Sequence, residues 1–131
     1  MAPHPTIPSQ HLWRDQIVDT PDEILTLLFD NYRVLMYAGD FDGSMCNQLG
    51  VYRTLRSVPW GHSDSFNAAS RCLWRMGGQP AGMAQSAGGL TWVVVFNSGH
   101  LVPMNQPAHA FEMIRRLLDG STPSLCEQPA A

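Results

Sequence analysis

The sequence contains no lysine and has little excess charge of either sign. All eight basic residues are arginines, the acidic residues number 11, and the formal net charge is −3 at pH 7. Because nucleic-acid-binding surfaces depend on clustered positive charge, this balance argues against such a surface. Long hydrophobic runs are also missing, since Trp92 to Phe96, a run that no other wholly apolar run exceeds, falls far short of the ~20 residues of a membrane-spanning helix. We therefore expect neither a nucleic-acid partner nor a membrane partner.

Cysteine is scarce, and the chain carries only Cys46, Cys72 and Cys126. A sparse, odd set does not fit a small secreted scaffold that is held together by disulfides. At most one internal disulfide can form, and the sequence leaves its pairing open. The N-terminal residues have neither a basic flank nor an apolar stretch, so we expect no signal peptide in this chain. With 44% hydrophobic residues, the chain fits one ordinary domain or a piece of one.

Hydrophobic periodicity and turn residues predict an α/β chain. We expect residues 1–12 to be irregular, residues 13–119 to form the ordered domain and residues 120–131 to be a frayed tail. The predicted elements are a helix over 21–31, a strand over 34–38, a helix over 44–55, a loop over 57–70, strands over 73–76, 81–86 and 90–96, and a helix over 106–118. The apolar face of the last helix is predicted to consist of Ala110, Phe111, Ile114, Leu117 and Leu118.

Two of the predicted strands, 34–38 and 90–96, are apolar on both faces, which is typical of strands buried in a parallel sheet. Functional groups in open α/β sheets lie at the carboxyl ends of strands, where Asp40, Asp42 and His100 follow these two runs. A carboxylate can orient an imidazole, whose other nitrogen then accepts a proton from a nucleophile. The alternative is that the aspartates are ordinary turn formers and that the histidine is structural.

Two segments resemble the catalytic regions of the serine carboxypeptidases, an α/β-hydrolase family. Residues 34–47, Val-Leu-Met-Tyr-Ala-Gly-Asp-Phe-Asp-Gly-Ser-Met-Cys-Asn, resemble the family's catalytic aspartate segment. Residues 96–107, Phe-Asn-Ser-Gly-His-Leu-Val-Pro-Met-Asn-Gln-Pro, resemble its catalytic histidine segment. The match covers roughly residues 13 to 118, and further similar positions between the two segments are Trp60, Phe66 to Ala69, Trp74, Ala81 and Gly82. The resemblance implies a partial α/β-hydrolase fold, formed by the C-terminal strands and helices of a mainly parallel sheet.

The resemblance also implies roles for individual residues. Asp42 matches the acid of a Ser-Asp-His triad and His100 matches its general base, whereas Asp40 is expected to support the turn. Cys46 matches a cysteine near the substrate pocket, and Leu101 stands where relatives often carry methionine, so both are expected to contact substrate. The family needs neither a metal nor an organic cofactor. The remaining histidines match nothing in the family and are expected to be exposed or structural: His4, His11, His62 and His109.

The nucleophile of such an enzyme is missing from the sequence, because no Gly-x-Ser-x-Gly turn occurs. The nearest imitation places Ser86 between Asp42 and His100, which is the wrong chain order for the fold, so we interpret Ser86 as a hairpin turn residue. The chain therefore resembles a fragment or light chain of a carboxypeptidase that hydrolyses peptide or protein C-termini. Its expected partner is the missing N-terminal part, or a heavy chain, that carries the serine.

A sheet of two or three strands leaves unpaired edges and exposed apolar faces, so we expect the isolated chain to be marginally stable, oligomeric or dependent on its partner. A matured light chain, a truncated gene copy and a partial gene model all fit the sequence. Two other functions also fit: a truncated non-catalytic paralogue that binds a partner, and an acyltransferase that uses the same triad. The resemblance implies a lysosomal, vacuolar or secreted location.

Overall fold

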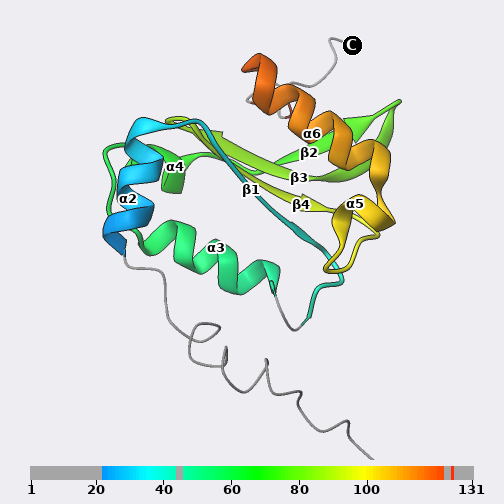
Figure 1. The fold of residues 1–131 in the computed structure, drawn as a ribbon, viewed down its shortest axis with the longest axis horizontal. Coiled ribbons are helices and arrows are strands. Elements are labelled where there is room, and N and C mark those ends of the chain that lie inside the picture. The colour runs from blue at the N-terminus through cyan, green and yellow to red at the C-terminus, as the bar shows by residue number, and fades with distance from the viewer. Residues whose placement is uncertain (1–21, 44–45, 123–124, 126–131) are drawn as a thin grey trace, which may run out of the picture.

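The computed structural model describes residues 22–43, 46–122 and 125, in which helices cover both faces of one four-stranded sheet (Figure 1). Within these ranges, no helix is long and apolar enough to cross a membrane. The elements, in chain order, are α2 (Asp22–Asn31), β1 (Val34–Gly39), α3 (Gln48–Ser57), α4 (Ser63–Ala68), β2 (Cys72–Met76), β3 (Gln79–Ala87), β4 (Leu90–Val95), α5 (Val102–Asn105) and α6 (Pro107–Asp119).

The strand order is β1-β4-β3-β2, which confirms the predicted α/β class. As predicted for the two most apolar strands, β1 and β4 run parallel, with Val34 opposite Leu90 and Gly39 opposite Val95. The β2–β3 and β3–β4 pairs are antiparallel. The four-stranded sheet of this chain is therefore mixed, whereas the sequence predicted strands of a mainly parallel sheet. The reason is local: two short glycine turns join these strands, and short connections can only produce antiparallel neighbours.

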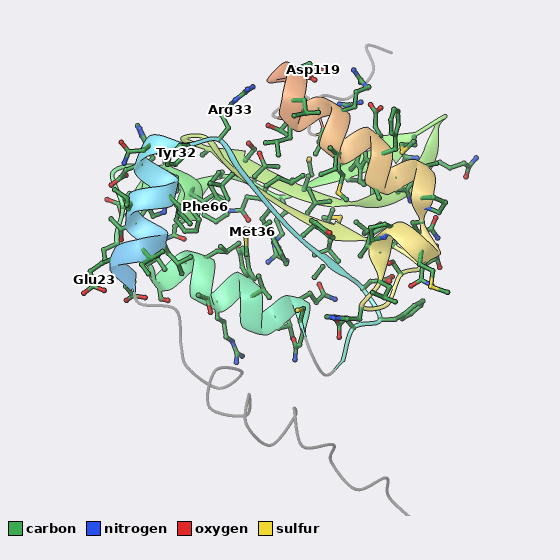
Figure 2. All side chains as sticks on the ribbon, viewed as in Figure 1. Glu23, Tyr32, Arg33, Met36, Phe66 and Asp119 are labelled. Atoms are coloured by element: carbon green, nitrogen blue, oxygen red, sulfur yellow. The ribbon has the colours of Figure 1, made fainter. Side chains whose placement is uncertain are left out.

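The core divides into two clusters because side chains alternate along the central strand β4. Trp92 and Val94 face α2, α3 and α4, whereas Val93 and Val95 face α5 and α6. Figure 2 shows Phe66 among the side chains that fill the first of these two layers. All residues of β4 are buried, as its largely apolar sequence predicts.

Strand β1 departs from the prediction that it is buried on both faces. Its residues Val34 to Met36 are only half-buried and Tyr37 is exposed. The reason is its place in the sheet, since β1 pairs with β4 on one side and no further strand of the described part covers its other edge.

The loop predicted over 57–70 is wrong in its middle, where the helix α4 forms. Its serine-rich sequence has no apolar period, but Phe66 is fully buried and anchors the turn. The buried Gln85 side chain also donates a hydrogen bond of 2.6 Å to the Phe66 carbonyl oxygen. Tertiary contacts therefore stabilise a helix that local sequence does not announce.

The boundaries and faces of two other helices also differ from the prediction. Helix α3 begins at Gln48, where the Asn47 side chain caps it by accepting bonds from the next backbone N–H groups; residues 44–45 lie outside the described ranges. Helix α6 buries Ala110 and Met113, whereas Phe111, Ile114 and Leu118 are exposed. The helix is apolar around a wide arc, and the sequence alone does not decide which half of that arc meets the sheet.

The segment after α6 was predicted to fray from residue 120. Thr122 and Leu125 are nevertheless buried, and Leu125 packs in the cluster beneath α6. The predictions for residues 1–21 lie outside the described residues.

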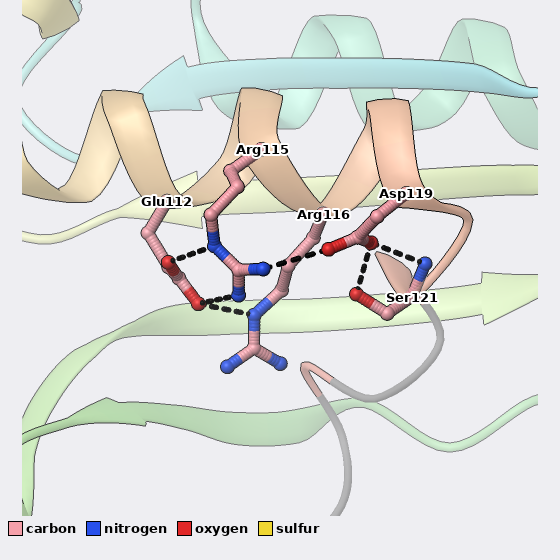
Figure 3. A network of polar contacts seen from close by, with 5 residues as sticks. All are labelled: Glu112, Arg115, Arg116, Asp119 and Ser121. Atoms are coloured by element: carbon pink, nitrogen blue, oxygen red, sulfur yellow. Dashed lines mark hydrogen bonds and ion pairs between the residues drawn. The ribbon is translucent and has the colours of Figure 1, made fainter.

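A network of ion pairs runs along α6 and reaches Ser121 (Figure 3). Glu112 accepts hydrogen bonds from Arg115 and Arg116 at 2.7–2.9 Å, and Arg115 also reaches Asp119 at 2.7 Å. Asp119 in turn accepts bonds from the backbone and side chain of Ser121. The hydrogen bonds from Arg115 and Arg116 lower the pKa of Glu112 from 4.5 to about 2.

Replacing Glu112 by glutamine is expected to remove part of the acid sensitivity of folding. Because the pKa of Glu112 is lower in the folded chain, its stabilisation is complete above pH 4.5 and disappears as the pH falls toward about 2. The pairs are partly exposed, so we expect an effect below about 1 kcal/mol. Urea unfolding between pH 2 and 6 measures it, with Arg53→Gln as a control outside the network. An equal acid dependence in wild type and Glu112→Gln would contradict the assignment.

Candidate active site

The carboxyl ends of β1 and β4 are joined by hydrogen bonds that bring their two polar loops together. The backbone N–H groups of Asp40 and Phe41 donate to the carbonyl oxygens of Val95 and Ser98, at 3.0 and 2.9 Å. The Asp40 carboxylate accepts a 3.0 Å bond from the backbone N–H of Ser98. Asp40 therefore supports the turn, as the resemblance implies.

Gly39 permits this close approach, because it is the last residue of β1 and faces the turn after β4. A Cβ atom at position 39 would lie 2.2 Å from the carbonyl oxygen of Ser98 and 2.3 Å from that of Gly99. Both neighbours are backbone atoms that cannot rotate away, so only glycine fits at this position. Gly39, three positions before Asp42, thus controls the spacing of the two loops.

Asp42 and His100 are in direct contact, as their positions at adjacent strand ends predict. The Nδ1 atom of His100 lies 2.8 Å from Oδ2 of Asp42. The Asp42 side chain is 3% exposed and that of His100 is 49% exposed. A buried carboxylate thus holds one nitrogen of a ring that is open to solvent on its other side, which is the geometry required to orient an imidazole for proton transfer.

The loop that carries His100 is itself held by side chains to which sequence reasoning gave no role. Asn97 adopts a positive φ of 56°, a conformation that asparagine tolerates better than most residues. The Asn105 side chain accepts a 3.0 Å bond from the backbone N–H of Gly99, and Gln106 donates a 3.1 Å bond to the carbonyl oxygen of Asn97. The polar residues around the short helix α5 are the sequence feature that could have indicated these loop contacts, but α5 itself was not predicted.

Cys46 and Leu101 both lie beside the Asp42–His100 pair. The backbone N–H of Cys46 donates a 3.1 Å bond to Oδ2 of Asp42, and the Cys46 thiol is free and exposed. Potential ligand atoms of Asp42, Cys46 and His100 all lie within 4.8 Å of one another. Leu101 follows His100 directly and is 59% exposed. Cys72, by contrast, is disulfide-bonded, so its thiol is not available.

Ser86 is not positioned as a nucleophile. It lies in β3 rather than in the hairpin turn to which the sequence assigned it, and its hydroxyl group bonds with the Thr91 hydroxyl group at 2.8 Å. His62 is exposed and His109 is half-buried against the Trp74 ring, in line with their expected minor roles. His4 and His11 lie outside the described residues.

A carboxylate–imidazole pair at the carboxyl edge of an α/β sheet is the arrangement that α/β-hydrolases use. A solved structure supports this fold: the prohormone-processing carboxypeptidase KEX1(delta)p from Saccharomyces cerevisiae matches 76% of this chain and 22% of its own, with a TM-score of 0.64 and 23% identity. The family model for "Serine carboxypeptidase" matches residues 6–120. The chain belongs to the serine carboxypeptidase family.

Curated relatives agree with this assignment. Pheromone-processing carboxypeptidase KEX1 of Phytophthora infestans is 38% identical over 104 residues, which cover 78% of this chain and 17% of the relative. Serine carboxypeptidase 3 of Triticum aestivum is 39% identical over 97 residues, which cover 74% of this chain and 19% of the relative. The chain thus spans less than a fifth of the length of these relatives.

Proposed function

We propose that this chain supplies the aspartate and the histidine of a serine carboxypeptidase triad that acts on peptide or protein C-termini. The contact between His100 Nδ1 and Asp42 Oδ2 carries the proposal. A serine from the remaining part of the enzyme attacks the last peptide carbonyl, and Nε2 of His100 accepts its proton and returns it to the leaving amine. Asp42 holds the ring in the required tautomer and stabilises the imidazolium that forms.

The partner in this proposal is the N-terminal part of the enzyme, which carries the serine. Two observations on residues 22–43, 46–122 and 125 support it: none of their strands covers the outer edge of β1, and several of their apolar side chains remain in solvent around the sheet. An edge strand of a parallel pair can accept a further parallel strand through its free backbone groups. The exposed apolar residues on α2, β1 and α6 are Ile24, Leu27, Leu28, Tyr32, Tyr37, Phe111, Ile114 and Leu118. A second copy of this chain would cover the same surface but, by the sequence, would bring no nucleophile.

The proposal is tested with a chimera in which residues 22–131, which include all three cysteines, replace the matching segment of the Triticum aestivum carboxypeptidase, which is 39% identical to this chain over 97 residues. We expect the chimera to release C-terminal residues from N-blocked peptides. A fluorophosphonate probe should label its serine and leave the isolated chain unlabelled. Labelling of the isolated chain would contradict a nucleophile supplied by another part.

The same assay separates the remaining functions. A folded but inactive chimera would favour a non-catalytic paralogue. Transfer of the acyl group to an added alcohol at the expense of hydrolysis would favour an acyltransferase, since both reactions share the acyl-enzyme formed on the serine.

We also propose a lysosomal, vacuolar or secreted location. The Cys72 disulfide supports an oxidising compartment, and the low pKa of Glu112 keeps the α6 network charged in acidic surroundings. Imaging of the tagged full-length gene product tests this location, and a cytosolic signal would contradict it.

A further inference from the structure

Asp42, Cys46 and His100 bring three different kinds of metal ligand together at one point. A carboxylate oxygen, a thiol sulfur and an imidazole nitrogen lie within 4.8 Å of one another. We propose that these three side chains bind one zinc-like divalent cation. The ion is not a cofactor of the proposed reaction, because that reaction needs none.

The donor set selects the class of ion. Carboxylate oxygen, imidazole nitrogen and thiolate sulfur are the three kinds of ligand that zinc takes from proteins, and a site with three protein ligands keeps its fourth position open. Magnesium and calcium prefer oxygen ligands alone, so a thiolate and an imidazole disfavour both.

The distances require only small movements. Zinc bonds of about 2.0–2.1 Å at tetrahedral angles place a nitrogen and an oxygen ligand about 3.3 Å apart. The 2.8 Å separation of His100 Nδ1 and Asp42 Oδ2 therefore has to widen by about half an ångström. A sulfur and a nitrogen on zinc lie about 3.5 Å apart. Because all three ligand atoms lie within 4.8 Å of one another, the thiol has to approach by at most about 1.3 Å.

The backbone of Cys46 already lies close to the Asp42 carboxylate. The N–H of Cys46 is bonded to Oδ2 of Asp42, so the start of the cysteine side chain is already anchored beside the carboxylate. Rotation about the Cα–Cβ bond of Cys46 is then the main freedom left to the sulfur. The carboxylate is buried, whereas the thiol and the imidazole are exposed, so an ion can enter from solvent.

Binding of the ion changes the protonation of Cys46 and His100 and releases one proton in total. The Cys46 thiol releases its proton to solvent, and the ring proton of His100 moves from Nδ1 to Nε2. A ring that holds metal on Nδ1 and a proton on Nε2 cannot accept a proton from a serine. Occupancy would therefore inhibit catalysis; this consequence, unlike binding itself, rests on the proposed function.

The test uses the full chain without reductant, which preserves the Cys72 disulfide. Calorimetric titration with zinc chloride is expected to show one ion per chain, with one proton released as judged from buffers of different ionisation enthalpy. Titration with cobalt(II) should produce a thiolate-to-cobalt charge-transfer band. Cys46→Ser should abolish that band and weaken zinc binding by more than the roughly 10–100-fold that the loss of a supporting contact costs.

Asp42→Asn and His100→Gln are also expected to weaken zinc binding. His62→Gln, which removes an exposed histidine outside the cluster, should bind zinc like the wild type. Circular dichroism establishes that each variant is folded. Absence of saturable zinc binding, or an unchanged affinity and cobalt spectrum in Cys46→Ser, would overturn the proposal. Because no readout uses activity, failure here is distinguishable from failure of the proposed function.

Discussion

Replacing Asp42 by asparagine in the chimera is expected to lower kcat about 10⁴-fold, the effect of the same change in a serine-protease triad. The buried Asp42 carboxylate holds Nδ1 of His100 at 2.8 Å. An asparagine of the same shape carries no charge to stabilise the imidazolium, and its amide group can select the wrong tautomer of the ring. Steady-state hydrolysis of an N-blocked peptide measures the effect, which should fall on kcat far more than on KM.

Asp64→Asn is the matched control for this substitution. Asp64 lies on the exposed surface of α4, away from the Asp42–His100 pair, so this variant should keep the kcat of the chimera. Turnover within about tenfold of the parent in a folded Asp42→Asn variant would mean that Asp42 is not the triad acid.

Replacing Gly39 by alanine is expected to destabilise the chain by about 3 kcal/mol, at the upper end for overpacking. The added methyl group would lie 2.2–2.3 Å from two backbone carbonyl oxygens, so the ends of β1 and β4 have to separate. That movement displaces Asp42 relative to His100, and a shift of about 1 Å can cost roughly 100-fold in catalysis. Urea unfolding of the full chain and kcat/KM of the chimera measure the two effects.

Gly50→Ala is the matched control, because the same methyl group meets nothing within 4 Å at that position. Gly50 lies inside helix α3, where alanine should instead stabilise the chain by about 0.5–1 kcal/mol. Equal stabilities of Gly39→Ala and the parent chain would contradict the role assigned to Gly39 in setting the spacing of the two loops.

Sequence patterns predicted the parts of the fold that depend on neighbours along the chain. The apolar runs of β1 and β4, the glycine turns around β3 and the helical period of α2 and α6 all led to elements that the structure confirms. Helix α4 escaped prediction because its stability comes from the burial of Phe66 and from the Gln85 bond, which join segments far apart in sequence. The buried face of α6 was also predicted incorrectly, because tertiary packing decides which of its apolar residues meet the sheet.

The sequence by itself determined the α/β class, the family resemblance and the two residues, Asp42 and His100, on which the proposed chemistry depends. Local pattern suffices for these because strand period, turn residues and motif spacing are properties of short segments. Only the tertiary structure decided that the two side chains meet at 2.8 Å, that Gly39 allows this approach and that Cys46 lies beside them. These are contacts across the sheet, and their distances follow from the packing of separate strands rather than from the order of residues along any one of them.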